Sequence, residues 1–253
     1  MDGLKVENVE LQDIIDIYEK EVRVNTKNKK KIFRFERFKM ENLVSAYDIL
    51  TNDERYQMKY NIFMIHSPKY RIVMSLDTKD KVINHYVTRF VLMPKLEKFL
   101  DMRNVATRKD MGKDFGIRLL KKYLEHYKTK ENCYVLKMDL SKYFYSIDHQ
   151  KLKSMLKPHL SNDEYRFVCD IIDSTNESYV NEKITKLKEK ELARVIERQR
   201  EIESIPIYKS GKGLPIGNMS SQFLSIFYLN ELDHRIVHDY HLKHYIRYMD
   251  DII

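Results

Sequence analysis

Two adjacent aspartates, Asp250 and Asp251, stand between apolar residues near the end of the sequence. The apolar positions in residues 245–249 and 252–253 predict a β-hairpin that carries both carboxylates at its turn. Neighbouring carboxylates in apolar surroundings repel each other and lose hydration, so a divalent cation would stabilise them. Mg²⁺, which prefers oxygen ligands, is the expected ion. The alternative is a polar surface turn in which both acids face water.

A third carboxylate, Asp139, closes a predicted strand over residues 134–139. Lys137 and Asp139 would share one face of this strand, because successive side chains alternate. An aspartate at the end of a strand, just before a turn, is well placed to hold a metal ion. The alternative is that Asp139 caps the helix that follows.

A glycine-rich segment, residues 211–222, holds three of the six glycines of the chain. Glycine permits close approach of the backbone to a ligand. The following residues, 221–232, are apolar on nearly every side and predict a buried helix. The segment is therefore either one wall of a nucleotide pocket or a packing element.

The remaining elements would position these residues. Helical spacing of apolar residues predicts helices over residues 9–18 and 115–127. Ser161 and Glu164 predict a capping box at the start of another helix. Residues 181–204 are dense in charge, with a thin apolar stripe that includes Ile196, and predict a mostly solvated helix inserted between two functional blocks.

A basic and aromatic stretch, residues 27–39, alternates phenylalanine with charged residues. This period of two predicts an extended segment with one basic face, which could follow a phosphate backbone. An ordinary amphipathic edge strand is the alternative. The net charge of +8 also favours a polyanionic partner. The basic candidates in this stretch are Lys29, Lys30, Lys31, Arg34 and Arg37.

Composition narrows the setting of the 253-residue chain. Cys133 and Cys169 lack the paired spacing of a metal site, which favours a reducing cytoplasm. The first ten residues lack the apolar run of a signal peptide, and no apolar run is long enough to span a bilayer. Four histidines lie close together, and we interpret them as a solvent-facing helix end, with zinc binding as the alternative. They are His234, His238, His241 and His244.

Three of these segments occur in the order typical of the palm motifs of reverse transcriptases, which the chain resembles over roughly residues 65–253. Residues 137–144 resemble the first aspartate motif of that family, and residues 214–222 resemble its nucleotide-pocket motif. Residues 248–251, Tyr-Met-Asp-Asp, match its Tyr-x-Asp-Asp signature.

Segments upstream of the acids resemble the fingers of the same family. Residues 70–72, 79–83 and 92–94 resemble its fingers strands. Residues 104–113, with Arg108 and Lys109, resemble a further fingers motif that contacts nucleic acid.

The resemblance implies an α+β fold with the fingers and palm of a right-hand polymerase and an antiparallel palm sheet packed on helices. Residues 1–130 would form a fingers-rich region. Residues 131–253 would form the palm, with the insertion at about 181–204. Because the sequence ends just after the acid hairpin, we expect a truncated palm and no thumb.

The resemblance also assigns roles. Asp139 and Asp250 would bridge two Mg²⁺ ions, with Mn²⁺ as a possible substitute, while Asp251 and the Leu140 carbonyl complete the site. Phe144 would exclude a ribose 2′-hydroxyl. Further contacts to the incoming nucleotide would come from Arg71, Lys81, Pro215, Ile216 and Gly217.

The implied activity is RNA-directed DNA synthesis from dNTPs on an RNA template with a DNA or RNA primer. The resemblance favours bacterial enzymes, of the type found in diversity-generating retroelements or a group II intron-like type. Ile216 replaces the usual glutamine, and in diversity-generating retroelements this replacement accompanies error-prone copying. An RNA-dependent RNA polymerase, against which Phe144 argues, and a non-catalytic or defence-associated relative remain the alternatives.

Overall fold

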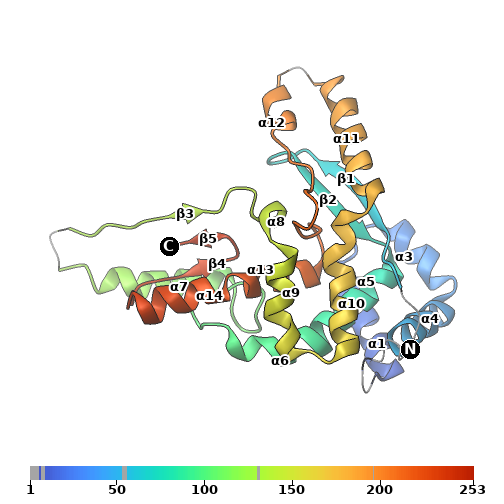
Figure 1. The fold of residues 1–253 in the computed structure, drawn as a ribbon, viewed down its shortest axis with the longest axis horizontal. Helices are drawn as coiled ribbons and strands as arrows, with labels where there is room; N and C mark the ends of the chain where they lie inside the picture. The colour runs from blue at the N-terminus through green and yellow to red at the C-terminus, as the bar shows by residue number, and fades with distance from the viewer. Residues whose placement is uncertain (1–5, 7–8, 53–55, 130–131, 196) are drawn as a thin grey trace.

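The computed structural model describes residues 6, 9–52, 56–129, 132–195 and 197–253. Helices dominate, and two small antiparallel sheets are set among them (Figure 1). One sheet is the hairpin β1–β2, and the other has the strand order β3-β5-β4. The mixed helix-and-sheet class predicted from the sequence is thus confirmed in outline. Among the described residues, no helix has the length and apolarity needed to cross a membrane.

The N-terminal helices pack against each other at one end of the molecule (Figure 1). The predicted helix over residues 9–18 is present, and a π-helical turn extends it. Ile14 and Tyr18 are fully buried on its inner face. The elements are α1 (Leu11–Ile17), η1 (Tyr18–Val22), α2 (Arg23–Asn25), α3 (Lys29–Glu36) and α4 (Lys39–Thr51).

Helix α3 corrects the prediction of an extended basic segment. Asn28 caps this helix, because its side chain accepts hydrogen bonds from the backbone of Lys30 and Lys31. Phe35 is buried and stacks on Tyr18 with ring centroids 4.6 Å apart, whereas Phe33 is 72% exposed. The alternating phenylalanines therefore do not share one buried face, and their period of two was misleading.

The β1–β2 hairpin joins Tyr60–Ile65 to Arg71–Leu76, with Tyr60 opposite Leu76. The expected fingers strand at residues 70–72 thus begins β2. The other two expected fingers strands are wrong, because residues 79–83 and 92–94 are helical. Val82 and Ile83, together with Tyr86 just after the first segment, are buried at helical spacing. The helical elements here are α5 (Thr78–Tyr86), η2 (Val87–Leu92), α6 (Met93–Leu96) and η3 (Glu97–Phe99).

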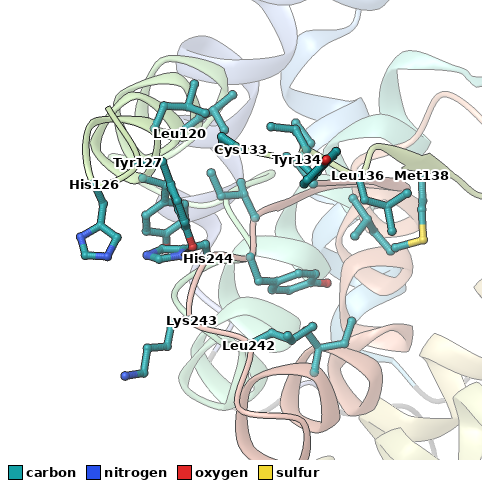
Figure 2. A pocket seen from close by; sticks show the side chains of 18 of the residues that line it. Leu120, His126, Tyr127, Cys133, Tyr134, Leu136, Met138, Leu242, Lys243 and His244 are labelled. Atoms are coloured by element: carbon teal, nitrogen blue, oxygen red, sulfur yellow. Dashed lines mark hydrogen bonds between the residues drawn. The ribbon is translucent and has the colours of Figure 1, made fainter. Parts of the chain in front are cut away.

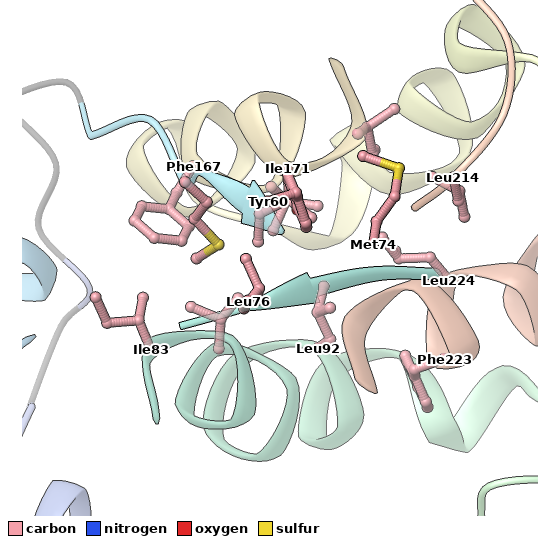
Figure 3. Packing of buried hydrophobic residues seen from close by; sticks show 14 of the residues in the cluster. Tyr60, Met74, Leu76, Ile83, Leu92, Phe167, Ile171, Leu214, Phe223 and Leu224 are labelled. Atoms are coloured by element: carbon pink, nitrogen blue, oxygen red, sulfur yellow. The ribbon is translucent and has the colours of Figure 1, made fainter. Parts of the chain in front are cut away.

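Strand β2 lies in the middle of the hydrophobic core (Figure 3). Its buried residues Ile72, Met74 and Leu76 alternate with more exposed ones. Figure 3 shows Met74 and Leu76 between Phe167 and Ile171 above and Leu92 below. Burial from both sides fixes the position of Arg71, the first residue of this strand.

Helices α8 to α10 follow Asp139 in the chain and pack in the centre of the molecule. Ser161 and Glu164 form the predicted capping box at the start of α10. The predicted helix over residues 115–127 is also present, as α7. The elements are α7 (Lys113–Glu125), β3 (Met138–Asp139), α8 (Tyr143–Ser146), α9 (His149–Leu156), η4 (Lys157–His159), α10 (Asn162–Asp173) and η5 (Ser174–Asn176).

The charge-dense insertion forms two helices, α11 (Ser178–Leu192) and α12 (Gln199–Glu203). Most of its described residues are exposed, as predicted, although Ile184 and Ile202 are fully buried. Helix α11 packs against β1, and both helices stand beside the hairpin in Figure 1. Ile196, part of the predicted apolar stripe, lies outside the described residues.

The C-terminal region holds the second sheet. The predicted buried helix at residues 221–232 is divided between α13 (Met219–Tyr228) and α14 (Asn230–His234), which η6 (Arg235–Asp239) follows. The short strands β4 (Arg247–Tyr248) and β5 (Asp251–Ile252) form the predicted hairpin.

Strand β3 is shorter than the predicted strand over residues 134–139. It pairs with β5 only through Met138–Ile252 and Asp139–Asp251. Residues 134–137 have no strand paired with them among the described residues. The side chains of Tyr134 and Leu136 are therefore exposed.

Candidate active site

The three predicted acids line a single cavity of about 620 Å³. Asp139 reaches it from β3, and Asp250 and Asp251 reach it from the hairpin turn and β5. Asp139 lies opposite Asp251 in the antiparallel register, so residues far apart in sequence become cross-strand neighbours. Asp139 is exposed and does not cap a helix, since Lys142 precedes α8 as its N-cap.

The acid turn itself is strained. Met249 adopts a φ of 58°, in the left-handed region that side chains rarely occupy. This conformation lets Tyr248 and Asp251 pair across the hairpin with only two residues between them. Asp250 is one of those two residues, so the geometry of the turn sets the direction of its carboxylate.

The site concentrates negative charge. Burial raises the pKa of Asp250 above its usual value, and the charges of Asp139 and Asp251 raise it further, while Arg71 opposes them. Lys137 forms an ion pair with Asp251, its Nζ lying 3.2 Å from Oδ1. A cation placed among these carboxylates would therefore be favoured electrostatically.

Three carboxylates in one cavity offer the oxygen ligands that Mg²⁺ and Mn²⁺ prefer. Among the described residues, however, no three His, Cys, Asp or Glu side chains converge closely enough to hold a metal ion as they stand. The donor types of Asp139, Asp250 and Asp251 fit a divalent cation, and their carboxylates would have to turn toward one another to bind it.

Arg71, Phe144 and Ile216 line the same cavity as the acids. Arg71 is the first residue of β2, and Phe144 lies on α8. The Phe144 carbonyl accepts a hydrogen bond from the Leu214 N–H at 2.8 Å. The ring of Phe144 packs edge-on against Tyr143, with centroids 5.8 Å apart. The glycine-rich segment thus fixes the aromatic residue beside the cavity.

The same segment docks on β2. The Met74 N–H donates to the Ile216 carbonyl at 2.8 Å, and the Asn218 side-chain amide donates to the Met74 carbonyl at 3.1 Å. A Cβ on Gly217 would meet Val73 at 2.9 Å, and the φ of Gly217 is 113°, so only glycine fits here. Pro215 is buried and Gly217 exposed, and neither lines the cavity.

Lys81 lies apart from the acids. It sits on α5, and its ammonium donates to the Thr26 hydroxyl at 3.4 Å. Burial lowers the pKa of Lys81, and the neighbouring charge of Lys31 lowers it further. Lys81 does not line the cavity, so the structure brings only Arg71 of this predicted pair to the acids.

The basic candidates fall into two groups. On α3 and its C-terminal cap, Lys29, Lys30, Arg34 and Arg37 are exposed, whereas Lys31 forms an ion pair with Asp77.

In the loop before α7, Lys109 is exposed but Arg108 points inward. The guanidinium of Arg108 donates to the carbonyls of Asp101 and Asn104 at 2.8 and 3.2 Å and forms an ion pair with Glu97. These contacts hold the loop together.

Helix α12 provides a side of the cavity that was not predicted from the sequence. Glu201 lines the cavity and accepts a hydrogen bond from the Tyr70 N–H at 2.8 Å. Arg198 lies over the Tyr70 ring, 4.5 Å from its centroid, and forms an ion pair with Glu201 at 2.6 Å. Two residues of the insertion, Arg198 and Glu201, therefore hold Tyr70, the residue before Arg71, in place.

A second cavity, of about 590 Å³, lies on the other face of the β3-β5-β4 sheet (Figure 2). Met138 and Ile252 line it, whereas their neighbours Asp139 and Asp251 line the acid cavity, because side chains alternate along a strand. Its lining is mostly apolar and aromatic, including Tyr134 and His244.

The four clustered histidines divide between two places. His234 and His238 stack with ring centroids 5.4 Å apart, and the His234 ring contacts the Phe99 carbonyl. His241 and His244 line the second cavity instead. The zinc alternative has no support, since no metal-holding group of three such side chains occurs in the described part of the chain.

The acid hairpin and the aspartate that faces it have the arrangement that the resemblance to polymerase palm motifs implies. The family model of the reverse transcriptase (RNA-dependent DNA polymerase) matches residues 59–253. This match covers most of the chain, and the chain belongs to the reverse transcriptase family. No curated protein matches it.

Proposed function

We propose that this chain acts as an RNA-directed DNA polymerase, which transfers a nucleotide from a dNTP to a primer 3′-hydroxyl. One observation carries the proposal: Asp139, Asp250 and Asp251 share a cavity with Arg71 and Phe144. Phosphoryl transfer depends on charge neutralisation and positioning more than on covalent chemistry, and this cavity offers groups for both.

Asp139, Asp250 and Asp251 would hold two Mg²⁺ ions, or Mn²⁺ in their place. Bound there, the ions would neutralise the triphosphate and activate the primer hydroxyl. The Leu140 carbonyl is a further candidate ligand. Leu140 lines the cavity, and its carbonyl accepts a hydrogen bond from the Tyr143 N–H at 3.2 Å; a carbonyl oxygen has a second lone pair that a cation would use.

The incoming nucleotide would lie between β2 and α8. Arg71 would bind the triphosphate through its guanidinium, and Phe144 would fill the space that a ribose 2′-hydroxyl needs. Ile216 would contact the base pair through shape alone, since its side chain offers no hydrogen bond. This pocket suits a dNTP, and it supports a relationship to the reverse transcriptases of diversity-generating retroelements.

Template and primer would bind along exposed basic side chains. Lys29, Lys30, Arg34 and Arg37 on and next to α3, together with Lys109, are accessible to a phosphate backbone. Arg108 would support the loop that presents Lys109. Binding through these residues should weaken as salt rises, because it releases counterions.

Asp250→Asn tests the proposal. The variant keeps the shape of the side chain and loses its charge, so dNTP addition to a primer on an RNA template should fall to background while the circular dichroism spectrum and melting temperature stay close to wild type. Asp239→Asn, at an exposed aspartate outside the cavity, is the matched control and should remain active.

The same assay separates the alternative functions. Preference for dNTPs over rNTPs supports a reverse transcriptase, and the reverse preference would indicate an RNA-dependent RNA polymerase. Salt-sensitive RNA binding without any Mg²⁺- or Mn²⁺-dependent incorporation would indicate a non-catalytic relative.

A further inference from the structure

Arg247, three residues before Asp250, is completely buried. Its partner Asp233, on α14, is equally buried. Nε of Arg247 lies 2.7 Å from Oδ1 of Asp233, and its second terminal nitrogen lies 2.5 Å from Oδ2. The two side chains form a bidentate pair, the geometry that guanidinium and carboxylate groups favour.

The remaining contacts of Arg247 reach two backbone carbonyls. One terminal nitrogen donates to Ile226 at 2.8 Å and the other donates to Met249 at 2.8 Å. Ile226 lies in the last turn of α13, where helix carbonyls lack partners within the helix. Met249 is the residue with positive φ in the acid turn. A single guanidinium therefore joins α13, α14 and the acid turn.

The backbone of Arg247 is held as well. Its N–H donates to the Arg103 carbonyl at 2.9 Å, and its carbonyl accepts from the Val105 N–H at 3.0 Å. Tyr245 supports the acid partner, because its hydroxyl donates to Oδ1 of Asp233 at 2.6 Å. The backbone of Arg247 is thus fixed, and its guanidinium binds the peptide group between Met249 and Asp250.

Stability alone is a weak reason for such a pair. Desolvation of two buried charges costs about as much as their attraction returns, and apolar replacements are often neutral or stabilising. The hydrogen bond from Arg247 to the Met249 carbonyl instead stabilises the conformation of the acid turn. A left-handed non-glycine residue is strained and persists only where its surroundings hold it, and Arg247 supplies a hydrogen bond at that point.

We propose that Arg247 is a positioning residue for the polymerase reaction: anchored by Asp233, it holds the Met249 carbonyl and so keeps Asp250 directed into the cavity that Asp139 shares. The inference rests on the proposed function, because it assumes that Asp250 takes part in nucleotide transfer. Arg247 itself does not line the cavity and touches no reactant.

The decisive variant removes both buried charges together. Arg247→Met combined with Asp233→Asn leaves no unpaired charge and keeps an acceptor for the Tyr245 hydroxyl. We expect a melting temperature near that of wild type, a kcat lower by on the order of a hundredfold, and little change in the KM for dNTP or in the Kd for primer–template. The Mg²⁺ concentration for half-maximal activity should rise. A stable double variant with wild-type kcat and Mg²⁺ requirement would overturn the proposal.

Arg247→Lys decides the question if the double variant does not fold. A lysine keeps the charge next to Asp233 but cannot reach the carboxylate and the Met249 carbonyl together. We expect it to fold, to lose at least about tenfold in kcat and to need more Mg²⁺. Wild-type kcat and Mg²⁺ requirement in this variant would contradict the inference, as would a loss confined to template binding.

Amide hydrogen exchange separates failure of this inference from failure of the proposed function. Exchange at residues 249–252 should be faster in Arg247→Lys than in wild type, whether or not the wild type polymerises. An inactive wild type with this change would refute the proposed function and leave the anchoring role in place. Unchanged exchange in the variant would refute the anchoring role.

Discussion

The Lys137 ammonium lies 3.2 Å from Oδ1 of Asp251, a residue that lines the acid cavity. The lysine side chain is 66% exposed and the aspartate 46% exposed, so water weakens the pair and its contribution to stability is small. Its position matters more than its strength. Lys137 contacts an oxygen that the proposed divalent cation would use, so the two cations would compete for it.

Replacing Lys137 with methionine should therefore favour the metal. Exposed pairs are worth about 0.2–1 kcal/mol, so the Mg²⁺ concentration for half-maximal dNTP incorporation should fall by up to about fivefold in Lys137→Met. Lys142→Met is the control, because Lys142 lines the same cavity and the change in charge is equal. An equal fall in the Mg²⁺ requirement of both variants would mean that the lysines act only through their charge, without competition for an Asp251 oxygen.

Phe144→Ala should relax discrimination between sugars. Loss of the ring opens space beside the proposed dNTP, so kcat/KM for CTP should rise relative to that for dCTP. Tyr145→Leu, which changes another aromatic residue that lines the cavity, should leave the ratio unchanged. An unaltered ratio in Phe144→Ala would show that Phe144 acts in packing alone.

Arg198→Ala should weaken nucleotide binding from a distance. The variant loses the contact with the Tyr70 ring and the ion pair with Glu201, and Tyr70 precedes Arg71. Since a cation–π contact is worth about 0.5–2 kcal/mol, the KM for dNTP should rise by about threefold or more, with kcat nearly unchanged. Arg200→Ala, at an exposed arginine of α12, should have no effect.

His85 should make the fold sensitive to mild acid. Burial lowers the pKa of His85 below its ordinary 6.5. Lys81 and Arg89 lower it further, and Glu21, 2.9 Å away, opposes them. The folded state then binds fewer protons than the unfolded state, so stability is present above this ordinary pKa and lost as pH falls below it.

Melting curves between about pH 7.5 and pH 5 test this expectation. The loss of melting temperature across that range should be smaller in His85→Gln than in wild type. His238→Gln, at an exposed position, should follow the wild-type curve. Parallel curves for wild type and His85→Gln would show that other groups control the response to acid.

The acid hairpin could be predicted because its signals are local. Asp250 and Asp251 occupy a turn between apolar residues, and strand pairing needs only these neighbours. The capping box of Ser161 and Glu164 is local in the same way. Asp139 could be placed at a strand end for the same reason, although β3 proved much shorter than expected, because the length of β3 depends on the strand beside it.

Features that depend on distant partners escaped prediction. The alternation around Phe33 and Phe35 suggested a strand, and only the position of Tyr18 shows that a single one of these rings is buried. Glu201 was placed on a solvated helix, since nothing local reveals its bond to Tyr70. Arg247 was not singled out, because nothing in its local sequence reveals its partner Asp233.

The bridge between Asn104 and Arg247 joins positions more than half the chain apart. Bringing such distant segments together costs loop-closure entropy, so we expect these contacts to form late in folding. The acid turn depends on this bridge and on the contact between Arg247 and Asp233, so it should be among the last parts of the molecule to fold. A partly folded chain would carry its three carboxylates scattered, so the proposed polymerase activity should appear only when folding is complete.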